Sequence, residues 1–76
     1  MVEGTPILVP EIGTAAVSFG LWLVGEGESV SEGDRVAELL IPGACVDLVA
    51  PASGELKHLA ATGDHLKPGD SVGVVS

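Results

Sequence analysis

Short runs of Val, Leu and Ile alternate with turn residues along the whole chain. The 76 residues include 11 glycines and 5 prolines, and no segment keeps the i, i+3, i+4, i+7 spacing of an amphipathic helix. The clearest alternation runs from Val17 to Leu23, where the odd-numbered residues are large and apolar. Because strand side chains alternate between faces, we expect these residues to face the core and Trp22 to lie on the outer side. The pattern therefore predicts short β-strands.

The chain also contains an internal repeat with a constant offset of 36 residues. The segment LVGEGESVSEGDRVAEL aligns with LAATGDHLKPGDSVGVV, and the paired positions include Gly33 with Gly69 and Asp34 with Asp70. Glycine accepts a positive φ and an aspartate side chain accepts hydrogen bonds from nearby amides, so each pair predicts a tight turn. Two units are too few for a solenoid, which needs at least about three. The two halves, about 7–39 and 46–75, are instead expected to face each other.

These patterns predict one all-β domain over residues 1–76. Its expected fold is a flattened barrel or sandwich of two small antiparallel sheets with pseudo-twofold symmetry. Residues 40–45 would form a hairpin tip between the halves, since Pro42 suits the first central position of a type II turn and Gly43 suits the second. The expected core consists of aliphatic side chains: Val17, Leu21, Leu23, Val30, Val36, Leu39, Val46, Leu48, Leu56, Leu59, Leu66, Val72 and Val74 or Val75.

The charge and the hydropathy of the chain narrow the classes of partner. A net charge of −8, with only three strong cations, would repel a nucleic-acid backbone and suits either plain solubility or docking to a basic protein surface. No window approaches the about 20 apolar residues that a membrane span needs. The start of the chain, MVEGTPILVP, does not have the pattern of a signal peptide. We therefore expect a cytoplasmic protein without nucleic-acid or membrane partners.

Few side chains are candidates for chemistry. Cys45 is the single cysteine, so it cannot form an internal disulfide, and no cation or histidine adjacent in sequence would activate its thiol. His58 and His65 lack a third ligand at metal-site spacing, and we expect both to lie on the surface without binding a metal. The carboxylates fall on turns, whereas acid–base catalysis requires a cleft. We do not expect an enzyme.

Four segments resemble the lipoyl domains of the acyltransferase components of 2-oxo acid dehydrogenase complexes, which are relatives of biotinyl carrier domains. They are LVPEIG, WLVGEGESVSEGDRVAEL, APASGEL and GDHLKPGDSVGVV, and together they span nearly the whole chain from Ile7 to Val75. The resemblance implies a lipoyl-like barrel-sandwich fold. It also implies a carrier function, in which a lysine at a hairpin tip holds lipoate through an amide bond and moves acyl groups between active sites.

The hairpin tip departs from the pattern of that family. The family tip resembles E-T-D-K-A, whereas the aligned residues here are Leu40, Ile41, Pro42, Gly43 and Ala44. Gly43 therefore stands where the family has its attachment lysine, and the polar residues before it are apolar. Biotinyl carriers present their lysine between methionines, and the only methionine here is Met1. We expect neither lipoate nor biotin on this chain.

The resemblance also points to a surface for partners. In the family, the loop before the first long strand helps a dehydrogenase component to recognise its domain, and the matching residues are Glu11, Ile12, Gly13 and Thr14. The apolar tip residues Leu40, Ile41 and Pro42 are a second candidate contact, because exposed apolar side chains often anchor protein interfaces.

These observations favour a monomeric, non-catalytic docking or assembly module, with a 2-oxo acid dehydrogenase component as a candidate partner. Two other hypotheses stay open. The chain could be a working lipoyl or biotinyl carrier that uses an unexpected attachment residue, or a structural domain that associates with itself through the apolar tip.

Overall fold

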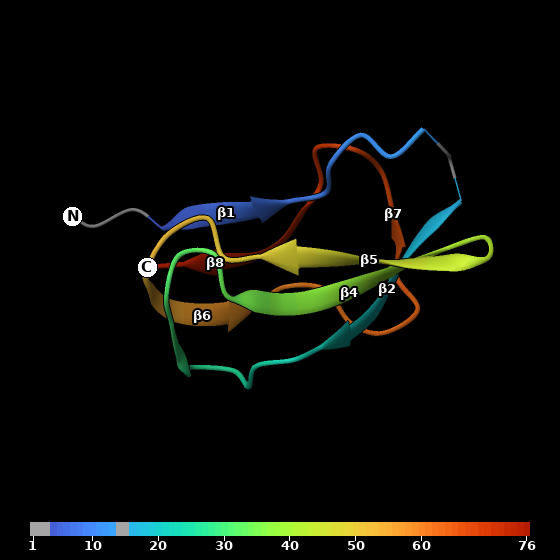
Figure 1. Ribbon diagram of the computed structural model, residues 1–76. Coiled ribbons are helices and arrows are strands. Elements are labelled where there is room, and N and C mark those ends of the chain that lie inside the picture. The colour runs from blue at the N-terminus through green and yellow to red at the C-terminus, as the bar shows by residue number, and fades with distance from the viewer. Residues whose placement is uncertain (1–3, 14–15) are drawn as a thin grey trace.

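The regular structure of the protein is entirely β in the computed structural model, which describes residues 4–13 and 16–76 (Figure 1). One sheet has the strand order β1 (Thr5–Leu8), β8 (Ser71–Val75), β6 (Gly54–His58) and β3 (Ser29–Val30). The other has the order β5 (Ala44–Val49), β4 (Arg35–Ile41), β2 (Val17–Trp22) and β7 (His65–Leu66). All strand pairs are antiparallel. The predicted sandwich of two small antiparallel sheets is confirmed.

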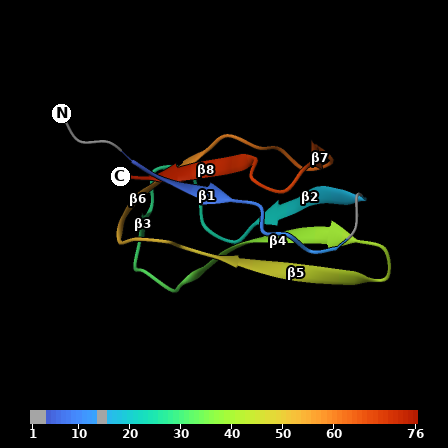
Figure 2. The same cartoon turned by 90° about the horizontal axis from the view of Figure 1, so that it is seen from above.

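The two sheets enclose one apolar core, and the molecule is elongated. Figure 2 shows the layered arrangement from above, and the extents are 37 × 21 × 19 Å. The hairpin between β4 and β5 projects from one end of the molecule, while the C-terminus and the start of β1 lie at the other end (Figure 1). The buried side chains are Ile7, Val9, Val17, Phe19, Val30, Val36, Ala37, Leu39, Leu48, Ala50, Leu56, Leu66, Val72 and Val75. No helix in the described ranges is long and apolar enough to cross a membrane.

Strands that are 36 residues apart occupy equivalent places in the two sheets. In chain order, β4 corresponds to β8, β3 to β7 and β2 to β6, and the strand order of one sheet maps onto that of the other under this exchange. The remaining pair, β1 and β5, lies at one edge of each sheet. The sequence repeat thus corresponds to an approximate twofold relation between the sheets.

Four carboxylates hold the turns of the repeat. Asp34 and Asp70 each accept a hydrogen bond from the backbone N–H three residues earlier, at 2.9 and 2.8 Å. Glu28 and Asp64 do the same at their own turns, both at 2.9 Å. The glycines before Asp34 and Asp70 have φ of 91° and 89°, which only glycine adopts without strain. Four of the 11 acidic residues therefore stabilise turns by accepting hydrogen bonds from the backbone.

A bulge at Gly20 overturns part of the expected core. The register of β2 against β4 shifts between Phe19 and Leu21, so the alternation of faces changes there. Leu21 and Leu23 consequently point outward, with exposed fractions of 45% and 44%, and not into the core as predicted. Leu59, which is equivalent to Leu23, was also expected to be buried and is exposed. Val46 is only half-buried, and of the two alternatives Val74 and Val75 it is Val75 that is buried.

The same bulge turns Trp22 inward, against the prediction that it lies on the outer side. Its indole is half-buried, packs against the core and stacks on the ring of His58, with centroids 4.1 Å apart and planes 2° apart. Trp22 Nε1 donates to the carbonyl of Ala60 at 3.0 Å. His58 Nε2 lies 2.8 Å from the carbonyl of Val24 and must be the donor, because a carbonyl can only accept. His58 is therefore a half-buried structural residue, whereas His65 is exposed as expected.

We predict that the two aspartate turns contribute equally to stability. Asp34→Ala and Asp70→Ala should each lower the free energy of unfolding by about 1 kcal/mol, because each removes a charged acceptor from one backbone N–H. Asp47→Ala is the matched control: its ion pair with Arg35 is exposed, so its loss should cost under about 0.5 kcal/mol. Urea unfolding measures all three, and a control as costly as the turn variants would contradict the assignment.

Candidate functional site

The hairpin between β4 and β5 ends in a two-residue turn. Ile41 pairs with Ala44, so Pro42 and Gly43 alone form the connection. Gly43 has a φ of 78°, which matches the second central position of a type II turn, with proline at the first. A Cβ placed on Gly43 would meet no atom within 4 Å, so the tip is open to solvent. The predicted turn is present at the expected residues.

The apolar side chains of the tip do not all project from it. Leu40 is 43% exposed and lies over Gly20, where a Cβ would come within 3.2 Å of Leu40 Cγ. Ile41 is half-buried and packs against the core, so it is not the exposed anchor that the sequence predicted. Cys45 is exposed and pairs with Leu40 across the strands. The exposed apolar surface of the tip consists mainly of Leu40 and Pro42.

The loop that follows β1 lies at the end of the molecule from which the hairpin projects (Figures 1 and 2). Glu11 and Gly13 are exposed, and Glu11 Oε1 accepts a hydrogen bond from the Gly13 N–H at 3.1 Å. Ile12 is half-buried and packs on the core, so it positions the loop. Thr14, the last of the predicted contact residues, lies outside the described residues. This loop and the hairpin tip therefore lie at the same end of the molecule.

Neither lysine belongs to the hairpin. Lys57 lies on β6, opposite Val74 of β8. Lys67 is exposed and precedes a second Pro-Gly pair. The backbone N–H of Lys67 donates a hydrogen bond to the carboxylate of Asp70. In the part of the chain that the structure describes, no three side chains of the metal-ligating types gather closely enough to hold an ion.

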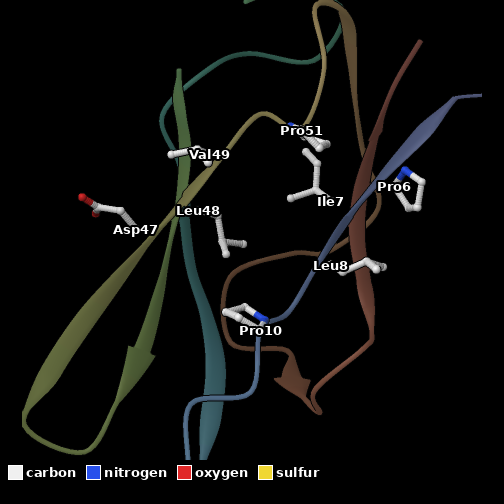
Figure 3. A pocket seen from close by; sticks show the side chains of 8 residues that line it. All are labelled: Pro6, Ile7, Leu8, Pro10, Asp47, Leu48, Val49 and Pro51. Atoms are coloured by element: carbon white, nitrogen blue, oxygen red, sulfur yellow. The ribbon is translucent and has the colours of Figure 1, made fainter. Parts of the chain in front are cut away.

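An apolar groove lies between β1 and β5 and was not predicted from the sequence (Figure 3). Its volume is about 400 Å³. The lining residues are Pro6, Ile7, Leu8, Pro10, Asp47, Leu48, Val49 and Pro51. A short similarity relates its two sides, because ILVP at 7–10 resembles LVAP at 48–51, but it does not predict that they lie side by side. The offset of this similarity is 41 residues, so the 36-residue alignment did not detect it.

The two groove segments are equivalent in the fold. The Gly69 N–H donates to the carbonyl of Val9 at 2.8 Å, and the Gly33 N–H donates to the carbonyl of Ala50 at 2.9 Å. Since Gly33 and Gly69 are partners in the repeat, Val9 and Ala50 are partners as well. The groove therefore lies at the approximate twofold axis between the sheets.

Comparison with known families agrees with this architecture. A model of biotin/lipoyl attachment domains, described as "Biotin-requiring enzyme", matches residues 5–75. The search of curated proteins found no match. The match covers both halves of the repeat, the hairpin and the groove strands. Domains of this kind carry a group for enzymes and are not catalytic themselves. The chain belongs to the biotin/lipoyl attachment domain family.

Proposed function

We propose that this chain is a carrier-type domain without a covalent cofactor, which serves as a protein-docking module related to the acyl-carrying domains of 2-oxo acid dehydrogenase complexes. The observation that carries the proposal is Gly43 at the solvent-exposed tip, the position at which the family resemblance implies an attachment lysine. Amide attachment of lipoate or biotin requires an amine, and residues 40–45 contain no amino side chain. The tip keeps the shape of a carrier hairpin but lacks an acceptor.

Docking is supported by what the same end of the molecule exposes. Leu40 and Pro42 offer apolar surface, and Glu11 adds a carboxylate on the neighbouring loop. Complete burial of two fully exposed apolar side chains contributes roughly 3–6 kcal/mol before the costs of association, and the gain here is smaller because Leu40 is only 43% exposed. A net charge of −8 favours a basic surface on the partner and speeds the encounter. A basic face of a dehydrogenase component has the required chemistry.

A second candidate function is a carrier that uses Lys67. This residue is exposed beside a Pro-Gly pair whose glycine has a φ of 89°, similar to that of Gly43. Lys67 precedes that pair and does not occupy its second position, so its amine is not presented as the family tip presents its lysine. We therefore rank this function below docking.

The first prediction concerns modification. Co-expression with a lipoate ligase, or with a biotin ligase, should leave the intact mass of the protein unchanged, because the tip has no amine. A lipoylated carrier domain expressed in the same cells controls for ligase activity. Addition of a lipoyl or biotinyl mass would overturn the proposal, and peptide mapping would then show whether Lys67 carries it.

The second prediction restores an acceptor. Pro42→Asp together with Gly43→Lys should make the protein a substrate of lipoate ligase, detected as an added lipoyl mass. Both changes are made because the family tip resembles Asp-Lys at these two positions. Replacing the glycine requires the turn to leave its φ of 78°, and a type I turn, in which both central residues have negative φ, accommodates the new side chains. A folded double variant that stays unmodified would contradict the placement of the tip.

The third prediction tests docking. Leu40→Asp should weaken binding to a purified 2-oxo acid dehydrogenase component at least tenfold, because it places a charge in the apolar contact. Leu59→Asp is the control, since Leu59 is exposed to a similar extent and lies outside the tip. Titration calorimetry gives the dissociation constants of both variants. Equal affinities of the two variants would remove the tip from the interface.

A further inference from the structure

The outer face of the sheet that contains β2, β4 and β5 carries most of the large apolar side chains that are exposed. Of the six such residues in the described ranges, four lie on this face: Leu21, Leu23, Leu40 and Val49. Each of them is next to a residue that packs in the interior, so the alternation of strand side chains turns all four outward. The other two, Leu8 and Leu59, lie on β1 and directly after β6, in the opposite sheet. Exposed apolar surface that is gathered on one face marks a contact site.

The strand register brings two of these leucines together. Leu21 of β2 is opposite Glu38 of β4, and Glu38 is opposite Asp47 of β5, so the three residues form a row across the face. Leu40 of β4 lies in the next row, and its side chain covers Gly20, the residue before Leu21. Leu40 and Leu21 therefore form one apolar surface, with two carboxylates beside it.

Leu23 extends this apolar surface along β2. Its N–H donates to the carbonyl of Val36 at 2.8 Å, so the chain continues beside β4 past the end of β2. Leu40, Leu21 and Leu23 thus form a leucine stripe. Alternate residues of a strand are about 6.6 Å apart, and residues four apart in a helix rise by about 6 Å. A helix laid along the stripe therefore places one apolar side chain on each leucine, and its diameter of about 10 Å covers two strands.

The charge beside the stripe selects the sign of the occupant. Asp47 points away from the interior, on the opposite side of β5 from Leu48, and Glu38 is half-buried next to it (Figure 3). Arg35 contacts Asp47 at 3.4 Å, and both side chains are exposed, at 67% and 45%. Such an exposed pair is weak, and one cation does not neutralise two carboxylates. The face therefore combines apolar surface with negative charge.

This charge excludes several occupants. A second copy of the chain would bring its own net charge of −8 and a second pair of carboxylates. An anionic amphiphile would bring its negative head group to Glu38 and Asp47. A helix that carries Lys or Arg next to its apolar side gains on two counts, because it relieves the repulsion between the carboxylates and is attracted by the field of the whole molecule.

We propose that the outer face of β2, β4 and β5 binds an amphipathic, cationic helix of a protein partner. Apolar residues of the helix pack on the leucine stripe, and Lys or Arg beside them meet Glu38 and Asp47. This inference rests on the docking role proposed above and names the element of the partner that is recognised. Leu40 belongs to both the tip and this face, whereas Leu21 and Leu23 belong to this face alone.

Selection from a displayed library of helices of about 18 residues tests the proposal. The library keeps apolar residues at positions i, i+3, i+4 and i+7 and randomises the others. Enriched peptides should carry Lys or Arg beside the apolar side, and a synthetic copy should shift the amide resonances of β2, β4 and β5 most strongly. Absence of enrichment, enrichment of acidic peptides, or shifts confined to the hairpin tip or to β6 and β8 would each overturn the proposal.

The approximate twofold relation supplies a matched control for the stripe. Leu23 and Leu59 are equivalent in the repeat, are 44% and 56% exposed, and lie on opposite sheets. Leu21→Asp and Leu23→Asp should weaken the binding of the enriched peptide at least tenfold, whereas Leu59→Asp should leave it unchanged. Amide dispersion verifies the fold of each variant. Equal affinities of Leu23→Asp and Leu59→Asp would refute the site, because both variants add the same charge.

Charge variants test the selection of a cationic helix. Glu38→Gln and Asp47→Asn should each weaken the peptide several-fold at low salt and by less at high salt, as expected for screened ion pairs. Glu55→Gln is the control, since Glu55 is exposed on β6 of the opposite sheet. An equal loss in the control would show attraction to the net charge alone and overturn the assignment. Binding of the peptide to this face without binding of a 2-oxo acid dehydrogenase component would refute only the partner proposed above.

Discussion

The stacked rings of Trp22 and His58 join the two halves of the molecule at their approximate twofold axis. The rings come from positions 36 residues apart, and each donates a hydrogen bond to a carbonyl that follows the other ring, Ala60 for Trp22 and Val24 for His58. Phe19 packs against the same indole at 4.9 Å between ring centroids. In a chain with only two Phe, Trp and Tyr residues, this cluster supplies packing that the aliphatic core cannot. The mutual orientation of the two sheets depends on it.

The turns of the fold could be predicted because their chemistry is local. Asp34 and Asp70 with their glycines determine the backbone within four residues, and the repeat identified them. The bulge at Gly20 could not be predicted from alternation, since it depends on the carbonyl of Glu38, which a Cβ at Gly20 would approach to 2.8 Å. Extending the 36-residue offset toward the N-terminus pairs Leu21 with Lys57 and Trp22 with His58. A lysine at the first of these positions is a sign that its partner faces outward.

In the candidate site, too, some features follow from the local sequence and others depend on contacts between distant segments. The turn at Pro42 and Gly43 follows from its two residues and was predicted correctly, whereas the burial of Ile41 depends on packing against strands distant in sequence. The groove depends on the approach of β1 to β5, 41 residues apart, and no local pattern predicts a meeting of two sheet edges. Both surfaces belong to a carrier fold that keeps its architecture independently of an attachment lysine, because that residue makes no contribution to the core.

The mass of the hairpin peptide from the protein in its own cells tests the central claim most directly. Trypsin cleaves after Arg35 and Lys57, so the tip is released as one peptide, residues 36–57. We predict that this peptide has the mass of its unmodified sequence. A lipoyl or biotinyl mass on this peptide, or on the longer peptide that remains when a modified Lys57 blocks cleavage, would contradict the proposal.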